Sequence, residues 1–252
     1  MVMYHVLLVL FLVSLVQAEL NLTFFDVGEG AATLISQGSS HILVDTGNPA
    51  TAPVLVRKVK KLTGGKLQAL IITHPHQDHI GGVFQILDEL NPKFRFDNGE
   101  KITKIDEPYR WFKEEFRREK YKKLKKGDFL KVGKGLIEVL SPGSLAVDWN
   151  ENSLVLKISY NNKCAVLMSD ALKKAENKIG GFECEVIQIG HHGSTYASSV
   201  SFVKSVRARL GIVSVNKNNL RGYPDDLVLK RWEKNGTKIF KTFESGDIKI
   251  SL

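Results

Sequence analysis

The chain has 252 residues, of which 43% are hydrophobic and 25% charged, a composition that can build a large core and excludes an intrinsically disordered chain. Its length allows one large domain or two small ones. The formal net charge of +9 and the isoelectric point near 9.4 suit an anionic partner, although lysine-rich surfaces also occur for solubility alone.

The first eighteen residues differ from the rest of the chain. They contain no Lys, Arg, Asp or Glu, and residues 6–13 form an unbroken apolar run. The stretch ends in Val16-Gln17-Ala18, which places compact residues at the −3 and −1 positions of a cut after Ala18, as in a secretory signal peptide. The run is too short to span a bilayer comfortably, but an uncleaved anchor or a buried strand stays open. We predict a signal peptide at 1–18 and a mature protein that is secreted or faces the periplasm or extracellular space.

Residues 19–252 show no repeat and no low-complexity linker, so we expect a single domain. Short runs rich in Val, Ile, Leu and Phe, bounded by Gly, Asp or Pro, predict strands at 21–26, 32–37, 41–45, 69–73, 137–140, 154–160, 165–168, 185–190 and 210–214. Apolar residues spaced three and four apart predict helices at 53–62, 80–90, 109–125, 200–209 and 225–234. Strands mixed with helices indicate an α/β fold in which helices cover packed sheets.

Residues 93–134 form the most charged stretch of the chain. They contain fifteen Lys or Arg residues and eight Asp or Glu residues, a local excess of seven positive charges. A solvated helix face and a rim that binds a polyanion both explain this excess. Four aromatic residues interleave with the charges, and their helical spacing favours core packing: Trp111, Phe112, Phe116 and Tyr121.

Two cysteines, Cys164 and Cys184, each lie in an apolar strand-like run. Buried cysteines often behave as small hydrophobic residues, so we expect free thiols. An exported protein leaves a disulfide open as the alternative.

The most informative segment follows the strand predicted at 69–73. It reads His74-Pro75-His76-Gln77-Asp78-His79 and continues into a helix through Gly81-Gly82. Imidazole nitrogen and carboxylate oxygen are ligands of Zn²⁺. A loop that leaves a strand end can turn His74 and His76 toward one position and Asp78 and His79 toward a second, and the glycines let the next helix begin close to the metals. We therefore predict a binuclear metal site that activates water for hydrolysis.

This run resembles the H-x-H-x-D-H signature of the metallo-β-lactamase superfamily, and nearly all of residues 21–252 resemble one branch of it, the extracellular hydrolase domain of ComEC-like bacterial DNA-uptake proteins. The resemblance implies a four-layer αββα sandwich. Besides the histidine run, it is carried by motifs that follow in the same order: Phe24–Gly30, Ile42–Gly47, Glu151–Leu156, Met168–Asp170 and Gly190–Ser194.

The resemblance also implies a ligand set for two divalent ions, with Zn²⁺ as the expected metal and Mn²⁺ as the alternative. The implied ligands belong to the matching motifs: His74 and His76 for the first ion, Asp78, His79 and His191 for the second, and Asp170 as the bridge between them.

Several assignments leave alternatives. Asp170 ends an apolar run and therefore lies at a strand mouth, but a turn or helix-cap aspartate fits the same position. His191 follows another predicted strand, where a packed histidine is the alternative, and His192 is the other candidate ligand of this motif. Asp45 and Asp26 have two possible roles each. Either they hydrogen-bond to the loop or to a ligand imidazole and hold it in place, or they are ordinary turn residues.

The chain departs from the family pattern at several positions. Asn152 stands where many members place a third histidine on the first metal, which leaves that site poorer in nitrogen and suits a harder ion such as Mn²⁺. The segment Gly222-Tyr223-Pro224 resembles a branch motif that reads G-H-P, so that Tyr223 replaces its histidine. Glu29 and Ala31 replace the usual Gln and Asp of the opening turn.

Two cations a few Å apart lower the pKa of a bridging water from about 15.7 to about 7 and stabilise negative charge as it develops. We expect the hydroxide to attack phosphorus or a carbonyl carbon, and we expect Asp78 to orient it. His192, Ser194 and Tyr223 are the candidate groups for assisting the leaving group.

Three functions fit these features. The first is a phosphodiesterase, in particular a nuclease that acts on extracellular DNA or RNA, because a basic surface attracts phosphates. The second is a hydrolase of a small carbonyl substrate such as a lactam, lactone or thioester. The third is a catalytically weak module that binds nucleic acid or another polyanion, which Asn152 and Tyr223 motivate.

Overall fold

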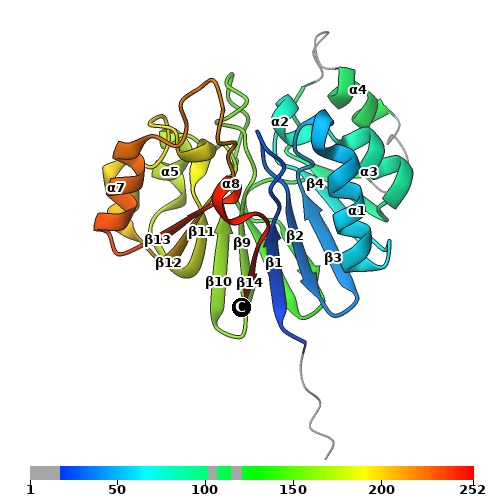
Figure 1. The fold of residues 1–252 in the computed structure, drawn as a ribbon, viewed down its shortest axis with the longest axis horizontal. Helices are drawn as coiled ribbons and strands as arrows, with labels where there is room; N and C mark the ends of the chain where they lie inside the picture. The colour runs from blue at the N-terminus through cyan, green and yellow to red at the C-terminus, as the bar shows by residue number, and fades with distance from the viewer. Residues whose placement is uncertain (1–17, 102–106, 115–120) are drawn as a thin grey trace, which may run out of the picture.

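The computed structural model describes residues 18–101, 107–114 and 121–252. Two seven-stranded sheets pack face to face, and helices cover the outer face of each sheet (Figure 1). The predicted four-layer αββα sandwich of the α/β class is confirmed. Residues 1–17 of the predicted signal peptide lie outside the described residues. No helix in the described part of the chain has the length and apolar character needed to cross a membrane.

The first sheet has the strand order β14-β1-β2-β3-β4-β5-β6. The strands from β14 to β3 pair antiparallel, whereas those from β3 to β6 run parallel. The strands are β1 Leu20–Phe24, β2 Thr33–Gln37, β3 Ser40–Val44, β4 Ala69–Ile72, β5 Phe94–Asp97, β6 Tyr121–Lys123 and β14 Ile248–Ser251. The helical segments between them are η1 Pro49–Thr51, α1 Ala52–Thr63, α2 Gln77–Ile80, α3 Val83–Leu90 and α4 Glu107–Glu114.

The second sheet has the strand order β13-β12-β11-β10-β9-β8-β7. The strands from β7 to β10 pair antiparallel, and those from β10 to β13 run parallel. The strands are β7 Phe129–Val132, β8 Gly135–Ser141, β9 Val155–Tyr160, β10 Lys163–Leu167, β11 Phe182–Gln188, β12 Val206–Val213 and β13 Lys238–Lys241. The helical segments are α5 Lys173–Ile179, η2 Gly190–Gly193, α6 Val200–Ser205, α7 Asp226–Lys234 and α8 Thr242–Ser245.

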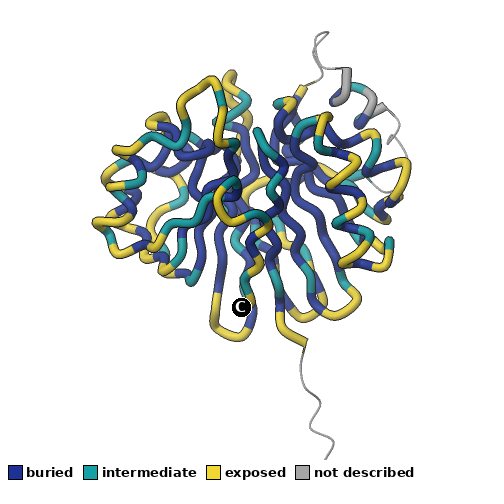
Figure 2. The backbone as a smooth tube through the Cα atoms, viewed as in Figure 1, coloured by how far each residue is buried: buried dark blue, intermediate teal, exposed yellow. Residues whose placement is uncertain are grey.

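Three apolar layers hold the sandwich together, one between the sheets and one under the helices on each side. Figure 2 shows that the strands of both sheets are largely buried. Strand β4 shows how the sequence supplies apolar side chains to two of these layers. Ala69 and Ile71 belong to the layer between the sheets, while Leu70 and Ile72 pack in the layer that includes α1 and α3. Both faces of the strand are therefore buried, which explains a continuous apolar run rather than an alternating one.

Local signals set the ends of several elements. Helix α1 has a proline at the start of its first turn and ends at Gly64, whose φ of 62° is the left-handed conformation that glycine adopts without strain. The predicted helix 109–125 is wrong in its extent, because α4 ends at Glu114 and β6 occupies 121–123. The predicted helix 200–209 is also too long, since α6 ends at Ser205 and Val206 pairs with Phe182 of β11. Pairing with a neighbouring strand outweighs the local helical spacing there.

The two cysteines form a disulfide, so the expectation of free thiols is wrong. Cys164 lies in β10 and Cys184 in β11, with their Cα atoms 4.8 Å apart. The two strands are parallel neighbours, and only the strand order of the sheet brings the cysteines together.

The described part of the basic stretch 93–134 spreads over β5, α4, β6 and β7. Phe112 is fully buried in the layer beneath α3 and α4, and Tyr121 packs against the same layer, so both pack in the core as expected, although Tyr121 does so from strand β6 rather than from a helix. The side chains of Trp111 and Phe116 lie outside the described residues.

Candidate metal centre

The predicted ligands come from the carboxyl ends of parallel strands in both sheets. His74 to His79 follow β4, Asp170 follows β10, and His191 and His192 follow β11. Parallel strands present their carboxyl ends at one edge of a sheet, where α/β proteins place their binding sites. The packing of the two sheets therefore brings three separated segments to one place.

Two overlapping groups of side chains hold their ligand atoms within 4.8 Å of one another: His74, His79 and Asp170, and Asp78, His79 and His192. Asp170 Oδ1 lies 3.1 Å from His79 Nε2 and 3.3 Å from His192 Nε2. His192 Nε2 also lies 3.5 Å from Asp78 Oδ2. Although they are buried, these atoms of Asp170, His79 and His192 form no directed hydrogen bond with the described residues. Buried polar atoms that converge without hydrogen bonds suit a cation.

The other oxygen of Asp170 faces a different set of imidazoles. Asp170 Oδ2 lies 3.7 Å from His74 Nε2 and 3.7 Å from His191 Nε2. His76 joins this side, because its Nδ1 lies 3.0 Å from His74 Nε2. Burial lowers the pKa values of His74 and His191, which favours the neutral rings that bind metals. Asp170 thus presents one oxygen to each of two histidine groups.

Residues behind the first group fix the orientation of its rings. The Asp45 carboxylate accepts hydrogen bonds from His79 Nδ1 at 2.7 Å and from the Thr73 amide at 2.8 Å. His192 Nδ1 donates to the carbonyl oxygen of Ser214 at 2.7 Å. Each ring therefore keeps Nε2 for the centre of the site, as metal-binding histidines commonly do. The predicted supporting role of Asp45 matches this geometry.

The charges of the site are strongly coupled. Burial would raise the pKa of Asp170, but the facing rings of His192 and His79 hold it well below its usual range. Burial likewise opposes the ionisation of Asp78, yet the facing His192 ring and the charge of His79 lower its pKa strongly. Burial lowers the pKa of His192, but Asp170 and Asp78 together raise it to about 10. Asp170 and Asp78 are thus ionised beside the protonated rings of His79 and His192, and a divalent cation could take the place of the ring protons.

The backbone around the site adopts conformations that most residues avoid. His191, His192, Ser169 and Asp45 have φ values of 50°, 54°, 49° and 61°. Such left-handed residues persist where the surrounding structure overdetermines them, and they concentrate at functional sites. Gly30 shows how tightly the turn after β1 fits, because an added Cβ would lie 1.9 Å from the carbonyl oxygen of Asp78.

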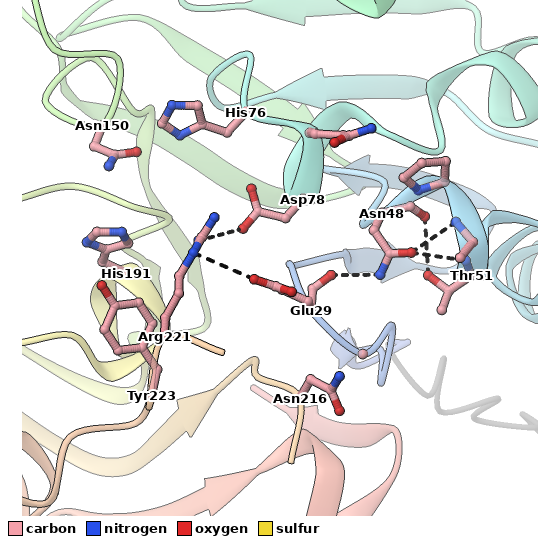
Figure 3. A pocket seen from close by; sticks show the side chains of 14 residues that line it. Glu29, Asn48, Thr51, His76, Asp78, Asn150, His191, Asn216, Arg221 and Tyr223 are labelled. Carbon is pink, nitrogen blue, oxygen red and sulfur yellow. Dashed lines mark hydrogen bonds and ion pairs between the residues drawn. The ribbon is translucent and has the colours of Figure 1, made fainter. Parts of the chain in front are cut away.

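A cavity of about 880 Å³ opens over the site, and its lining residues come from both halves of the molecule (Figure 3). Tyr223, a predicted catalytic residue, lines this cavity, and its ring lies 5.6 Å from that of His191. Arg221 also lines it, although no sequence motif singled this residue out. Its place beside the Gly222-Tyr223-Pro224 motif was the available signal.

Asn152, which replaces the third histidine of the family pattern, is fully buried and engaged elsewhere. Its Nδ2 donates to Glu100 Oε2 at 2.5 Å and to the Ala146 carbonyl at 3.0 Å, and its Oδ1 accepts from the Ala146 amide at 2.6 Å. Asn152 therefore anchors the loop that follows β8. The same loop carries Trp149, whose ring lies 5.4 Å from that of His76.

Two other candidates take structural positions. Ser194 is fully buried, and its hydroxyl accepts a hydrogen bond from the Tyr196 amide at 3.2 Å. Asp26 accepts from the amide of Gly28 at 3.2 Å, which is the turn role weighed for it above. His192 lies among the possible metal ligands rather than at the mouth of the cavity.

Comparisons with known proteins agree with this geometry. The profile of the metallo-β-lactamase superfamily matches residues 25–215. ComE operon protein 3 of Bacillus subtilis is 25% identical over 96% of this chain and 34% of its own length. Recombination protein 2 of Haemophilus influenzae is 28% identical over 90% of this chain and 28% of its own. Competence protein ComA of Neisseria gonorrhoeae is 26% identical over 93% of this chain and 32% of its own length. The chain spans about a third of the length of these relatives.

Solved structures show the same fold at low sequence identity. The metallo-β-lactamase fold protein YhfI of Bacillus subtilis superposes with a TM-score of 0.61 at 14% identity, over 93% of this chain and all of that one. A metallo-hydrolase of Ignicoccus hospitalis gives a TM-score of 0.56 at 14% identity, over 92% of this chain and 99% of its own. With the family profile covering most of the chain and the histidine and aspartate side chains gathered at the strand ends, the protein belongs to the metallo-β-lactamase superfamily and is a metal-dependent hydrolase.

Proposed function

We propose that the site binds two divalent ions, one on each side of Asp170. The ligands fall into two groups, which we name by the oxygen of Asp170 that each group faces. The Oδ1 group consists of Asp78, His79 and His192, and the Oδ2 group consists of His74, His76 and His191.

This assignment differs from the family-based expectation at one motif. His192 takes the place expected for His191, because it lies beside Asp78 and has its Nδ1 fixed by a carbonyl. His191 instead becomes the third imidazole of the Oδ2 group. That group is then not poor in nitrogen despite Asn152, and three imidazoles with a carboxylate favour Zn²⁺ over harder ions.

We further propose a phosphodiesterase that cleaves DNA or RNA. When bound, two divalent ions lower the pKa of a water between them to about 7 and stabilise negative charge on the reacting group. The single observation that carries the proposal is that Asp170 faces two histidine groups, members of which line an open cavity. The names of the relatives refer to competence and recombination, and the net charge of +9 attracts phosphates.

The residues of the chain have distinct tasks in this reaction. Asp78 lines the cavity, where its carboxylate can orient the attacking water. The Tyr223 hydroxyl is the group we assign to the leaving oxygen, since Tyr223 lines the cavity while His192 is used as a ligand. Asp45 and the Ser214 carbonyl keep the ligand rings in place.

The test combines metal analysis with a substrate screen. Purified protein loaded with Zn²⁺ or Mn²⁺ is assayed on single- and double-stranded DNA, on RNA, on bis(4-nitrophenyl) phosphate and on a lactone, a lactam and a thioester. We expect two ions per chain and phosphodiester cleavage that weakens as salt rises and disappears in Asp78→Ala. Cleavage of the carbonyl substrates alone, or binding of nucleic acid without cleavage, would contradict the nuclease proposal.

We also propose that the protein is exported. The disulfide between Cys164 and Cys184 supports this location, because such bonds form and persist in oxidising compartments. Expression in the host followed by fractionation and N-terminal sequencing tests the proposal. A protein recovered inside the cell with an intact N-terminus would contradict it.

A further inference from the structure

Arg221 lies on the loop between β12 and α7, a loop that side-chain hydrogen bonds close on itself. Asn219 Nδ2 donates to the Asn216 carbonyl at 2.9 Å, and Asn219 Oδ1 accepts from the Tyr223 amide at 2.9 Å. These bonds give the segment 216–223 a defined path along the wall of the cavity, with Asn216, Arg221 and Tyr223 all lining it. The position of Arg221 therefore results from the fold of the loop.

The guanidinium of Arg221 reaches from the second half of the molecule to acids of the first (Figure 3). Its Nη1 lies 3.4 Å from Asp78 Oδ2, and its Nε lies 3.7 Å from Glu29 Oε1. Both contacts are long, and half of the Arg221 side chain is exposed. Among the described residues that line the cavity, Arg221 is the only one with a lysine or arginine side chain.

Neither acid holds Arg221 firmly. Asp78 Oδ2 is also 3.5 Å from His192 Nε2, and in the proposed centre it serves as a metal ligand. A bound cation would compete with Arg221 for that oxygen. Glu29 is 43% exposed, and an ion pair in such a setting contributes little. A guanidinium has five donors in a planar fork that matches the oxygens of a phosphate, so Arg221 can exchange these weak contacts for an anion.

We infer that Arg221 binds a non-bridging oxygen of a phosphodiester in this cavity and thereby selects anionic over neutral substrates. While the cavity is free of substrate, the guanidinium makes only its weak contacts with Glu29 and Asp78. The inference deepens the proposed phosphodiesterase function and rests on it for the identity of the anion. A lactone or neutral ester has no charge for Arg221 to meet.

The chain offers a matched control in Lys217, which is exposed on the same loop and does not line the cavity. Arg221→Gln and Lys217→Gln each remove one positive charge from this loop. Each Zn²⁺-loaded variant is titrated with a fluorescent single-stranded phosphorothioate oligonucleotide, which resists cleavage, and binding is followed by anisotropy. We expect Arg221→Gln to weaken binding by about tenfold to a hundredfold, since a hydrogen bond to a charged group is lost. Lys217→Gln should weaken it by less than about threefold.

Kinetic assays on the same proteins separate substrate classes. For bis(4-nitrophenyl) phosphate we expect Arg221→Gln to raise KM strongly, while any hydrolysis of neutral 4-nitrophenyl acetate stays unchanged. Arg221→Lys should recover only part of the affinity, because an ammonium cannot form the planar fork. Glu29→Gln should bind the oligonucleotide at least as tightly as the unmodified protein. Metal content is measured for every variant, so that an effect through Asp78 is recognised.

Equal losses in Arg221→Gln and Lys217→Gln, an unchanged affinity in Arg221→Gln, or no oligonucleotide binding by the unmodified protein would overturn the inference. A different result would overturn the proposed function instead. If binding depends on Arg221 but no phosphodiester is cleaved, the anion site stands and the nuclease proposal fails.

Discussion

The two sides of Asp170 differ in how firmly the fold holds them. In the Oδ1 group, His79 and His192 are buried and each has its second ring nitrogen fixed, by Asp45 and by the Ser214 carbonyl. In the Oδ2 group, His74 is buried with its Nδ1 3.1 Å from the Thr73 hydroxyl, but His191 Nδ1 is buried without a hydrogen bond to any described residue, and His76 is only partly buried. Fixed ligands lose less conformational freedom on binding, so the Oδ1 group should bind its ion more tightly.

Asp170→Asn should have the largest effect, because Asp170 is shared by both groups. We expect loss of both ions and a fall in hydrolysis of about a thousandfold or more. Metal content after gel filtration and the rate of phosphodiester cleavage measure the two effects. Asp26→Asn is the control, since Asp26 serves a turn, and it should keep both ions. Retention of two ions by Asp170→Asn would show that the carboxylate is not the bridge.

His192→Ala and His191→Ala separate the two groups. His192→Ala should lose the tightly held ion, while His191→Ala should keep that ion and bind the second one less tightly. Competition with a chromophoric chelator, followed ion by ion, measures both affinities. The reverse pattern would restore the family-based assignment of His191 to the second ion.

Asp45→Asn tests whether the support behind His79 explains the firmness of the Oδ1 group. Replacing the carboxylate weakens the acceptor of the Nδ1 proton, and we expect the affinity for the tight ion to fall by about tenfold to a hundredfold. The same chelator titration gives the value. An equal fall for both ions would mean that Asp45 acts on the fold as a whole through Thr73.

Asn152→Ala should leave the number of bound ions at that of the unmodified protein. The side chain has its partners in Glu100 and Ala146, so its loss should lower the free energy of unfolding by about 1–3 kcal/mol. Denaturant unfolding of the metal-loaded protein measures this change. A variant that loses one ion but keeps its stability would identify Asn152 as a ligand.

Trp149→Ala should have the smallest effect. The ring contact with His76 limits the freedom of that imidazole, and such aromatic contacts are worth about 0.5–1.5 kcal/mol. We expect the affinity for the weaker ion to fall several-fold at most, with the tight ion unaffected. Trp149→Phe keeps a ring at this position, so its affinity for the weaker ion should lie between those of Trp149→Ala and the unmodified protein.

The sequence anticipated much of the fold, and the position of the candidate ligands at strand ends, for reasons that are local. The run His74–His79 follows directly from β4, so its side chains had to lie at a strand end whatever the rest of the chain did. Pro53 and Gly64 mark the two ends of α1 through their own backbone preferences. The predicted helices 109–125 and 200–209 were too long because Tyr121–Lys123 pair with β5 and Val206 pairs with β11, and neither pairing is local.

The amino-acid sequence alone indicated the type of chemistry, since imidazoles and carboxylates at successive strand ends are donors that divalent cations bind. Tertiary structure decided which oxygen of Asp170 each ring faces, because the left-handed backbone of His191 and His192 sends adjacent side chains to different places. It also decided that Arg221 enters the cavity, because only the packing of the two sheets brings that loop over Asp78. Side-chain direction depends on backbone angles and on neighbours distant in the sequence, and these exist only in the folded chain.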